Sequence, residues 1–304
     1  MDDFIQIAIR FMQNHFGDRA KGLVPVPAAG DWSKAYFFEL DGHDMVVRFG
    51  AYINDFEKDR AMSKYGSDTL PIPRVVEVGE TDTGFYAVSE RVPGAPLEEL
   101  SGPHIQLVLP RLLDVLYDLQ QLDFTDTRGV GLWRPRGVGP SWGDELLSVA
   151  EPRERLKGWR ERLDAWPLEA RMFDAGVERL RRLVPRLPEY QGIVHNDLLN
   201  RNVLVDAGKI TGIIDWGNAF YGDPLYDIAL LVYWWSWYPE WKDIDLQEIL
   251  DHHFNKHGGR PPQMDERLLC YLIHIGLDHV AYSAFRNRPE QMKRNAEQLL
   301  TYIQ

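Results

Sequence analysis

A polar loop between two apolar runs contains the residues best suited to chemistry in this sequence. It bears His195, Asp197 and Asn202, and a second carboxylate, Asp215, follows the next short apolar run. Phosphoryl transfer needs one carboxylate to orient the attacking hydroxyl, and oxygen ligands for the magnesium ion that neutralises the β- and γ-phosphates. The pattern H-x-D-x-x-x-x-N followed by I-I-D supplies both, so the sequence indicates phosphoryl transfer.

The elements before this loop are predicted to be rich in strands. Apolar residues recur at helical spacing from Phe4 to Phe16. Alternation over residues 45–49 predicts a strand with Arg48 and Val46 on the face opposite Met45, Val47 and Phe49. The other predicted elements are a helix over 54–65, capped at Asn54, and strands over 75–78 and 85–90.

The chain after Val92 is predicted to be mainly helical. The segment 92–96, Val-Pro-Gly-Ala-Pro, breaks the pattern and is predicted to be a hinge between lobes. Helices are expected over 105–122, 144–163, 168–184, 246–254, 266–284 and 289–304, around one strand-rich patch at 192–215. We therefore predict a two-lobed α+β fold, with a nucleotide-binding lobe over residues 1–92 and a catalytic and substrate-binding lobe over 93–304.

The composition excludes several classes of protein. The 304 residues carry a formal net charge of -12 and no basic stripe, which argues against nucleic-acid binding and favours cationic ligands. The acidic start lacks a secretory signal, and the apolar run 228–235 is shorter than the roughly 20 residues of a membrane span. The single cysteine, Cys270, allows no internal disulfide. These features predict a cytoplasmic protein without a membrane partner.

The whole pattern resembles the aminoglycoside phosphotransferase family, which has a protein-kinase-like fold. Besides the polar loop, the resemblance rests on the turn 30–34 (Gly-Asp-Trp-Ser-Lys), the connector 70–75 and the segment 222–229. Four features match the branch of the family that phosphorylates hygromycin B: a strand arginine, a Phe-x-Lys-Asp helix, a Gly-Val-Gly loop at 137–139 and an Ile-Gly-Leu-Asp helix at 275–278.

The resemblance implies a role for each residue that matches a family motif. Asp197 would be the catalytic base, and Asn202 and Asp215 the magnesium ligands. His195 and Asp227 would support the loop structurally. Ser33, Arg48, Asp59, Glu90 and Val92 would meet the nucleotide, with the backbone of 90–92 facing its base.

One position departs from the usual pattern of kinases of this type, which pair a strand lysine with a helix glutamate. Here the strand carries Arg48, and the matching helix position carries Asp59, although Asp55 and Glu57 are alternatives. The longer cation facing the shorter anion keeps the span of the pair, and arginine binds phosphate oxygens in a bidentate manner. The branch that acts on hygromycin B has a similar arginine.

The substrate is expected to meet the second lobe. An aromatic run after Asp227 includes Trp237, which either stacks on a sugar ring or packs in the core. The acids that follow, among them Asp243 and Asp245, form either a solvated helix face or a receptor for substrate amines. Asp278 is a further candidate, because in this family the same lobe supplies carboxylates to the substrate.

We therefore predict a monomeric enzyme that uses ATP or GTP with Mg²⁺ to phosphorylate a hydroxyl of a cationic aminoglycoside, with hygromycin B as the leading substrate, and so confers antibiotic resistance. One alternative is a kinase of the same fold acting on a macrolide, choline, homoserine or a fructosamine. Another is a nucleotide-binding pseudokinase that docks a partner, which the intact Asp197, Asn202 and Asp215 disfavour.

Overall fold

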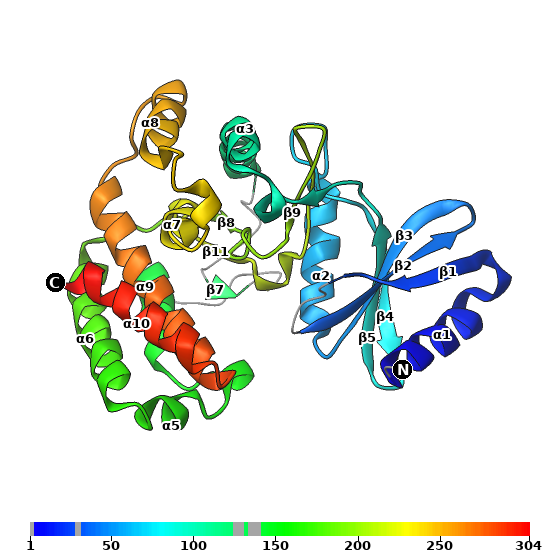
Figure 1. Cartoon of the computed structure of the whole chain (residues 1–304), viewed down its shortest axis with the longest axis horizontal. Helices are drawn as coiled ribbons and strands as arrows, with labels where there is room; N and C mark the ends of the chain where they lie inside the picture. Colours follow the sequence, from blue (N-terminus) through cyan, green and yellow to red (C-terminus); the bar gives the residue numbers. More distant parts are fainter. Residues whose placement is uncertain (1–2, 28–31, 124–130, 133–140) are drawn as a thin grey trace. The chain divides into compact units, whose positions relative to one another are not determined.

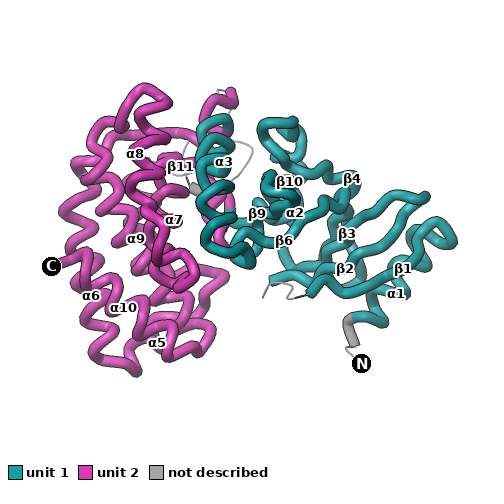
Figure 2. Tube along the Cα trace, turned by 45° about the horizontal axis from the view of Figure 1, so that its top comes forward, with its two compact units in different colours: residues 1–118, 200–218 teal, residues 119–199, 219–304 magenta. Residues whose placement is uncertain are grey.

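The computed structural model describes residues 3–27, 32–123, 131–132 and 141–304 (Figure 1). The chain forms two compact units, coloured separately in Figure 2. Unit 1 comprises residues 1–118 and 200–218, and unit 2 comprises residues 119–199 and 219–304. The predicted lobe of residues 1–92 lies wholly within unit 1. That unit also contains the segment 200–218, which is remote in sequence and carries both predicted magnesium ligands.

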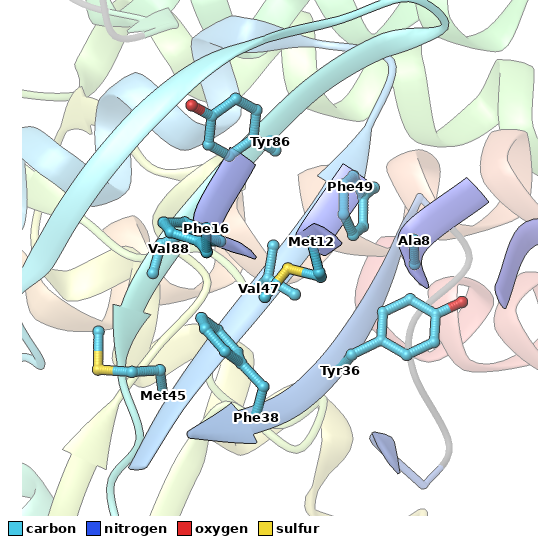
Figure 3. Packing of buried hydrophobic residues seen from close by; sticks show 10 residues of the cluster. All are labelled: Ala8, Met12, Phe16, Tyr36, Phe38, Met45, Val47, Phe49, Tyr86 and Val88. Carbon is cyan, nitrogen blue, oxygen red and sulfur yellow. The ribbon is translucent and has the colours of Figure 1, made fainter. Parts of the chain in front are cut away.

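Unit 1 is built on a five-stranded antiparallel sheet with the order β1-β2-β3-β5-β4. Its strands are β1 (Ala20–Pro25), β2 (Ser33–Leu40), β3 (His43–Gly50), β4 (Val75–Thr81) and β5 (Gly84–Glu90). Helix α1 (Asp3–Phe16) packs its apolar stripe, with Ala8, Met12 and Phe16 buried, against side chains of β2, β3 and β5 (Figure 3). The helix predicted from the spacing of apolar residues between Phe4 and Phe16 is therefore confirmed, and its apolar side packs in the core of unit 1.

Strand β3 alternates as predicted. Met45, Val47 and Phe49 are buried in that core, whereas Val46 and Arg48 are only partly buried. Because successive side chains of a strand point to opposite faces, Arg48 leaves the sheet on the side away from α1. Helix α2 (Ile53–Met62) and the short 3₁₀ helix η2 (Ser63–Tyr65) follow. The predicted cap at Asn54 is wrong, since the N-cap is Tyr52, whose side chain makes no capping hydrogen bond.

A second sheet of unit 1 joins the predicted hinge segment to the metal-ligand segment. Its order is β10-β9-β6, formed by β6 (Ala95–Pro96), β9 (Val203–Asp206) and β10 (Lys209–Ile213). The Thr211 hydroxyl also donates to the carbonyl of Pro93. Gly94 has φ +131°, and a Cβ there would lie 2.9 Å from the Val205 carbonyl oxygen, so this close approach requires glycine. The short 3₁₀ helix η3 (Leu97–Glu99) comes directly after β6.

Unit 2 is mainly helical around a small antiparallel sheet with the order β7-β11-β8. The strands are β7 (Gly131–Leu132), β8 (Gly192–Val194) and β11 (Phe220–Gly222). The helices are α4 (Trp142–Leu147), α5 (Trp159–Asp164), α6 (Pro167–Leu183), α7 (Leu225–Trp235), α8 (Leu246–Lys256), α9 (Met264–Phe285) and α10 (Pro289–Ile303), while α3 (Gly102–Gln120) begins in unit 1. The α+β organisation predicted from the sequence is confirmed.

Helix α9 is the core helix of unit 2. It is long and apolar enough to cross a membrane, but most of its apolar stretch is buried within the protein. Residues from Cys270 to Ala284 on its buried faces pack among α5, α6, α7 and α10. Its apolar character is thus accounted for by packing inside this unit.

One further prediction about secondary structure is wrong. The helix expected over 144–163 is interrupted, because Pro152 cannot donate a backbone hydrogen bond and Gly158 has φ +78°. The strand-rich patch predicted at 192–215 is confirmed, and its strands belong to two different sheets. Strand β8 pairs with β11 in unit 2, whereas β9 and β10 pair with each other and β6 in unit 1.

Candidate active site

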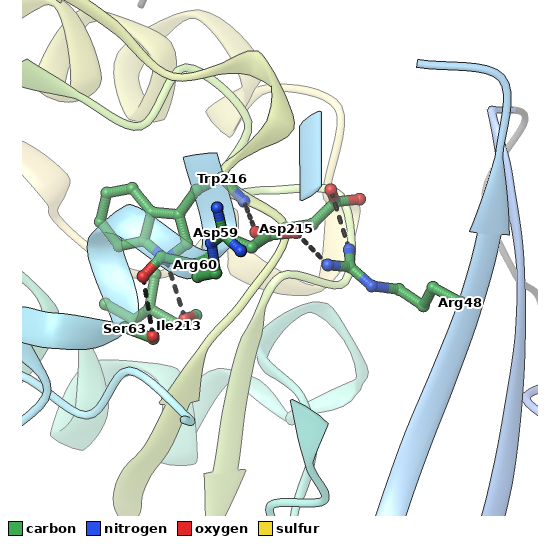
Figure 4. Close-up of polar contacts among 7 residues, drawn as sticks. All are labelled: Arg48, Asp59, Arg60, Ser63, Ile213, Asp215 and Trp216. Atoms are coloured by element: carbon green, nitrogen blue, oxygen red, sulfur yellow. Dashed lines mark hydrogen bonds and ion pairs between the residues drawn. The ribbon is translucent and has the colours of Figure 1, made fainter. Parts of the chain in front are cut away.

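The predicted metal ligand Asp215 belongs to an ionic network in unit 1 in which Arg48 contacts two carboxylates (Figure 4). It follows β10 with φ +60°, a left-handed conformation that is uncommon outside glycine, and its side chain is 45% exposed. One Arg48 nitrogen, Nη1, donates to Asp215 Oδ1 at 3.2 Å, and the other, Nη2, donates to Asp59 Oδ2. Asp59 Oδ1 accepts the backbone N–H of Trp216 at 2.7 Å. Asp59 therefore holds both the arginine and the backbone beside Asp215.

The charges of this network are largely removed from water. The side chains of Arg48 and Asp59 are only 15% and 5% exposed. Burial raises the pKa of Asp59 to about 6, Asp215 adds to that rise, and Arg48 opposes it. The two carboxylates outweigh burial at Arg48 and raise its pKa, so the guanidinium stays charged. A buried pair of this kind is costly to break by removing one partner.

The second predicted ligand, Asn202, is tied to the Asp215 segment through the backbone. Its carbonyl oxygen accepts the N–H of Ile214 at 2.9 Å, and the side chain is buried. Ile213 in turn donates to the carbonyl of Pro71 at 2.7 Å. An amide oxygen and a half-exposed carboxylate from adjacent segments are hard oxygen donors of the kind that Mg²⁺ prefers, so the residues present fit the ion.

A buried lysine that the sequence reasoning left without a role also belongs to this network. Lys58 lies next to Asp59 on α2, is 5% exposed, and donates from Nζ to the Gly217 carbonyl oxygen at 2.8 Å. A Cβ at Gly217 would lie 3.0 Å from Asp55 Cβ. The Phe-x-Lys-Asp motif noted in the sequence thus supplies two adjacent residues, and each holds a backbone group that follows Asp215.

The predicted catalytic residue Asp197 lies in unit 2, in the loop after β8. Its backbone N–H donates to Nδ1 of His195 at 3.3 Å, and His195 is fully buried. The buried carboxylate of Asp227, on α7, accepts the backbone N–H groups of His195 and Asn196 at 2.8 and 2.9 Å. Asn196 has φ +66°. This left-handed turn before Asp197 is thus held by a side chain from a helix about thirty residues later in the chain.

Asp227 carries an electrostatic cost. Burial raises the pKa of its carboxyl group to about 7, and the two backbone N–H donors oppose that rise. The carboxyl group therefore titrates near neutral pH. Its charge state affects the two hydrogen bonds that hold the loop bearing Asp197.

A second buried ionic group anchors the segment that leads into α7, and sequence reasoning gave its residues no role. Asp223 accepts two hydrogen bonds from Arg267 of α9, at 2.6 and 2.7 Å, and a third from the hydroxyl of Tyr271. Arg267 and Asp223 are both almost fully buried. Asp223 lies in the Gly222–Ala229 segment that the sequence singled out, but its partner comes 44 residues later and no local pattern indicates it.

The residues predicted to meet the nucleotide all lie in unit 1. Ser33 is the first residue of β2 and is partly buried opposite Gly50. The amide of Glu90 donates to the Arg74 carbonyl at 2.9 Å, and the next amide, that of Arg91, donates to the Asp44 carbonyl at 3.1 Å. These two amides already have acceptors within unit 1, and the backbone contact of residues 90–92 with a nucleotide base stays a prediction. The glycine of the predicted turn at 30–34 lies outside the described residues, as does the 137–139 loop.

The predicted substrate-binding residues all lie in unit 2. Trp237 donates from Nε1 to Gln298 at 2.7 Å, and the Arg294 guanidinium lies over its ring at 3.7 Å, which favours a packing role. Asp243 is exposed. Asp245 caps α8 by accepting the amide of Glu248 at 3.0 Å. The capping contact gives Asp245 a structural role that its position in an acidic run did not indicate.

Asp278 is partly exposed on α9 and is paired with Arg153. Burial alone would raise its pKa, but Arg153, with help from His279 and His274, lowers it below the usual range. Asp278 therefore remains ionised. An incoming ammonium group at this position would have to compete with Arg153.

These elements define a protein of the kinase-like fold with the residues of a phosphotransferase. The profile of the Phosphotransferase enzyme family matches residues 25–266, and the chain belongs to this family. It is 30% identical to the hygromycin-B 4-O-kinase of Escherichia coli over 84% of this chain and 72% of that protein. It is 31% identical to an aminoglycoside 3'-phosphotransferase of Streptomyces fradiae over 53% of this chain and 57% of that protein.

A solved structure agrees with these sequence relationships. The fold superposes with a TM-score of 0.82 on a thermostable variant of aminoglycoside phosphotransferase APH(4)-Ia, crystallised as a ternary complex with AMP-PNP and hygromycin B. The two chains are 27% identical, and the superposition covers 97% of each. The family and the two-lobed fold expected from the sequence are confirmed.

Proposed function

We propose that this phosphotransferase moves the γ-phosphate of ATP or GTP to a hydroxyl of an aminoglycoside, with hygromycin B as the leading substrate, and thereby confers resistance to it. One observation carries the proposal. The backbone bond from Ile214 to Asn202 brings an amide and the Asp215 carboxylate into one unit beside the Arg48–Asp59 pair. The identity to a hygromycin-B kinase over most of the chain supports the choice of substrate.

The chemistry follows from the groups that these residues present. Asp197 would orient the acceptor hydroxyl and take its proton late, because the transition state for phosphoryl transfer is loose. Arg48 would donate hydrogen bonds to phosphate oxygens from its two terminal nitrogens. Asn202 and Asp215 would hold Mg²⁺, which when bound neutralises the charge of the β- and γ-phosphates. We further propose that the enzyme acts as a monomer in the cytoplasm.

The proposed catalytic role is tested with Asp197→Asn. The variant should lose about 10²–10⁴-fold in kcat, since a general base is removed, while nucleotide affinity stays close to that of the wild type. The assay is phosphate transfer to a panel of aminoglycosides, macrolides, choline, homoserine and fructosamines. Near-normal turnover in the variant would remove Asp197 from the mechanism, and a neutral alcohol phosphorylated faster than any aminoglycoside would refute the substrate class.

The proposed cationic substrate is tested by neutralising three acids of unit 2 together. Asn replacements keep the α8 cap and the size of each side chain; the three sites are Asp243, Asp245 and Asp278. Each exposed pair with an ammonium group is worth only about 0.2–1 kcal/mol, so the effect should be a raised KM for the aminoglycoside and a flatter dependence of kcat/KM on salt. KM for the nucleotide should not change.

A matched control separates local contacts from net charge. Three exposed acids of unit 1 change the net charge equally when they are neutralised in the same way: Glu80, Asp82 and Asp206. This control should leave KM for the aminoglycoside as it is. Equal effects of the two triple variants would mean that general charge, and not a receptor in unit 2, attracts the substrate.

A further inference from the structure

The carboxylate of Glu98 contacts the turn that leads into Asn202. Oε1 of Glu98 accepts the backbone N–H of Arg201 at 2.7 Å. Arg201 has φ +66° and immediately precedes Asn202. Both residues belong to unit 1, although 103 positions separate them in the sequence.

Strand pairing explains why these two distant residues meet. Glu98 lies in η3, which begins where β6 ends, and β9 begins directly after Asn202. Strands β6 and β9 pair antiparallel, with Pro96 opposite Leu204. Leu97 is 1% exposed and anchors η3 in the core of the unit. The pairing of β6 with β9 therefore places Glu98 near the N-terminal end of β9, next to the turn at Arg201.

The turn needs such a partner. A left-handed conformation is uncommon for a residue with a side chain and persists where the surroundings enforce it. A backbone N–H removed from water also needs an acceptor, and a carboxylate is a stronger one than a neutral group. The next residue, Glu99, contacts Arg201 differently. It pairs with the guanidinium at 2.7 Å through side chains that are 49% and 41% exposed, a surface contact that water screens.

The second oxygen of Glu98 shows that the carboxylate is kept at some cost. Oε2 is buried and has no hydrogen-bond partner among the described residues. Burial also raises the pKa of Glu98, against the lowering effects of Arg201 and the backbone donors. The hydrogen bond from the Arg201 amide at 2.7 Å therefore links this buried carboxylate to the turn.

We propose that Glu98 is a positioning residue of the metal loop: it fixes the left-handed Arg201, and through it the placement of Asn202 for Mg²⁺. The role of Asn202 as a ligand rests on the proposed function. The turn itself does not, because the contact between Glu98 and the Arg201 amide involves only residues of unit 1.

Three variants at Glu98 and one at Glu99 test the proposal. Glu98→Ala removes the acceptor, Glu98→Asp keeps the charge but withdraws it by one methylene, and Glu98→Gln keeps an acceptor oxygen at full length. Glu99→Ala removes only the exposed pair with the Arg201 side chain. The first readout is amide hydrogen exchange in peptides that cover residues 200–203, which should quicken in the Ala and Asp variants only.

The second readout is the affinity for AMP-PNP with and without Mg²⁺, measured by titration calorimetry. Loss of a partner that orients a metal ligand typically costs about 10–100-fold in metal affinity, so we expect a loss near the lower end in Glu98→Ala and Glu98→Asp. Glu98→Gln and Glu99→Ala should stay within about twofold of the wild type, given that both leave the bond to the Arg201 amide in place. Affinity for AMP-PNP without metal should be unchanged in all four.

Three results would overturn the proposal. The first is wild-type exchange at 200–203 in Glu98→Ala and Glu98→Asp. The second is an equal loss in Glu99→Ala, and the third is a loss of AMP-PNP affinity that does not depend on Mg²⁺. If Glu98→Ala does not fold, the comparison of the Asp and Gln variants decides. Neither readout uses an acceptor substrate, so failure of the proposed substrate would leave this result standing.

Discussion

Replacing Asp59 by alanine tests the network around Asp215, because this single carboxylate serves two donors. Asp59 is 4% exposed, accepts the Trp216 amide at 2.7 Å and pairs with Arg48. The truncation leaves the Trp216 amide without this acceptor. It also leaves Arg48 with one of the two carboxylates that it now contacts, the half-exposed Asp215.

The expected loss of stability follows from these contacts. Removing one partner of a buried ion pair costs about 3–5 kcal/mol, and the remaining contact with Asp215 places Asp59→Ala near 3 kcal/mol. Asp59→Asn keeps an oxygen for the Trp216 amide and removes only the charge. An unsatisfied buried group costs about 1–3 kcal/mol, so the asparagine variant should be more stable than the alanine variant by about 1 kcal/mol or more.

The same change should affect the metal requirement. Without Asp59, Arg48 pairs with Asp215 alone of these two carboxylates. The tighter pair leaves the Asp215 carboxylate less available to coordinate Mg²⁺. We expect a higher Mg²⁺ concentration at half-maximal activity in Asp59→Ala. Urea unfolding measures the stability, and a magnesium titration of phosphate transfer measures the requirement.

Glu57→Ala is the matched control, since Glu57 is on the same helix and was an alternative partner in the sequence. It forms an exposed pair with Arg60, which is worth less than about 1 kcal/mol. The role of Asp59 in this network is refuted if Asp59→Ala is as stable as Glu57→Ala and has the same magnesium dependence. It is also refuted if the alanine and asparagine variants are equally stable, because the Trp216 amide would then contribute nothing.

Two further predictions concern the metal ligands and the loop. Asn202→Ala and Asp215→Ala should each raise the half-saturating Mg²⁺ concentration, Asp215 more so because it brings a full charge, and unchanged values in both would refute the assignment. The pKa of Asp227 is about 7 in the folded protein and ordinarily 3.8. Between pH 3.8 and pH 7 the folded protein therefore holds a proton on Asp227 that the unfolded chain has lost. Stability from this group is therefore full below about pH 4 and is lost as the pH rises through 7, by on the order of 4 kcal/mol. Urea unfolding at pH 5 and pH 8 should show a smaller difference in Asp227→Asn, and an equal difference would show that another group titrates.

Local patterns in the sequence were sufficient to place several residues of the candidate site on their elements. Alternation placed Arg48 on the face of β3 opposite the core, and the spacing of Asp197, Asn202 and Asp215 identified the loops that carry them. Spacing also favoured Asp59 over its neighbours, and the contact with Arg48 agrees. Such predictions succeed because side-chain direction repeats every two residues in a strand and about every 3.6 in a helix.

Other features depend on contacts between distant parts of the chain. The sequence predicted strands in the 192–215 patch but not their partners. Strand β8 pairs in unit 2 and β9 in unit 1, because each strand finds its partner elsewhere in the sequence. The acidic character of Asp245 suggested a receptor for amines, and only the structure shows that it caps α8. A residue type limits what a group can bind, whereas its neighbours decide which of those contacts is made.

The sequence by itself determined which chemical groups are present, their order along the chain and the faces on which the regular elements carry them. The tertiary structure alone decided which distant groups become hydrogen-bond partners: Asp223 with Arg267, and Glu98 with the Arg201 amide. These pairs are 44 and 103 residues apart, and the energy of a buried contact depends on distance in space and on exclusion of water. Neither the distance in space nor the exclusion of water follows from local spacing, so a pattern of residue types along the chain cannot predict these contacts.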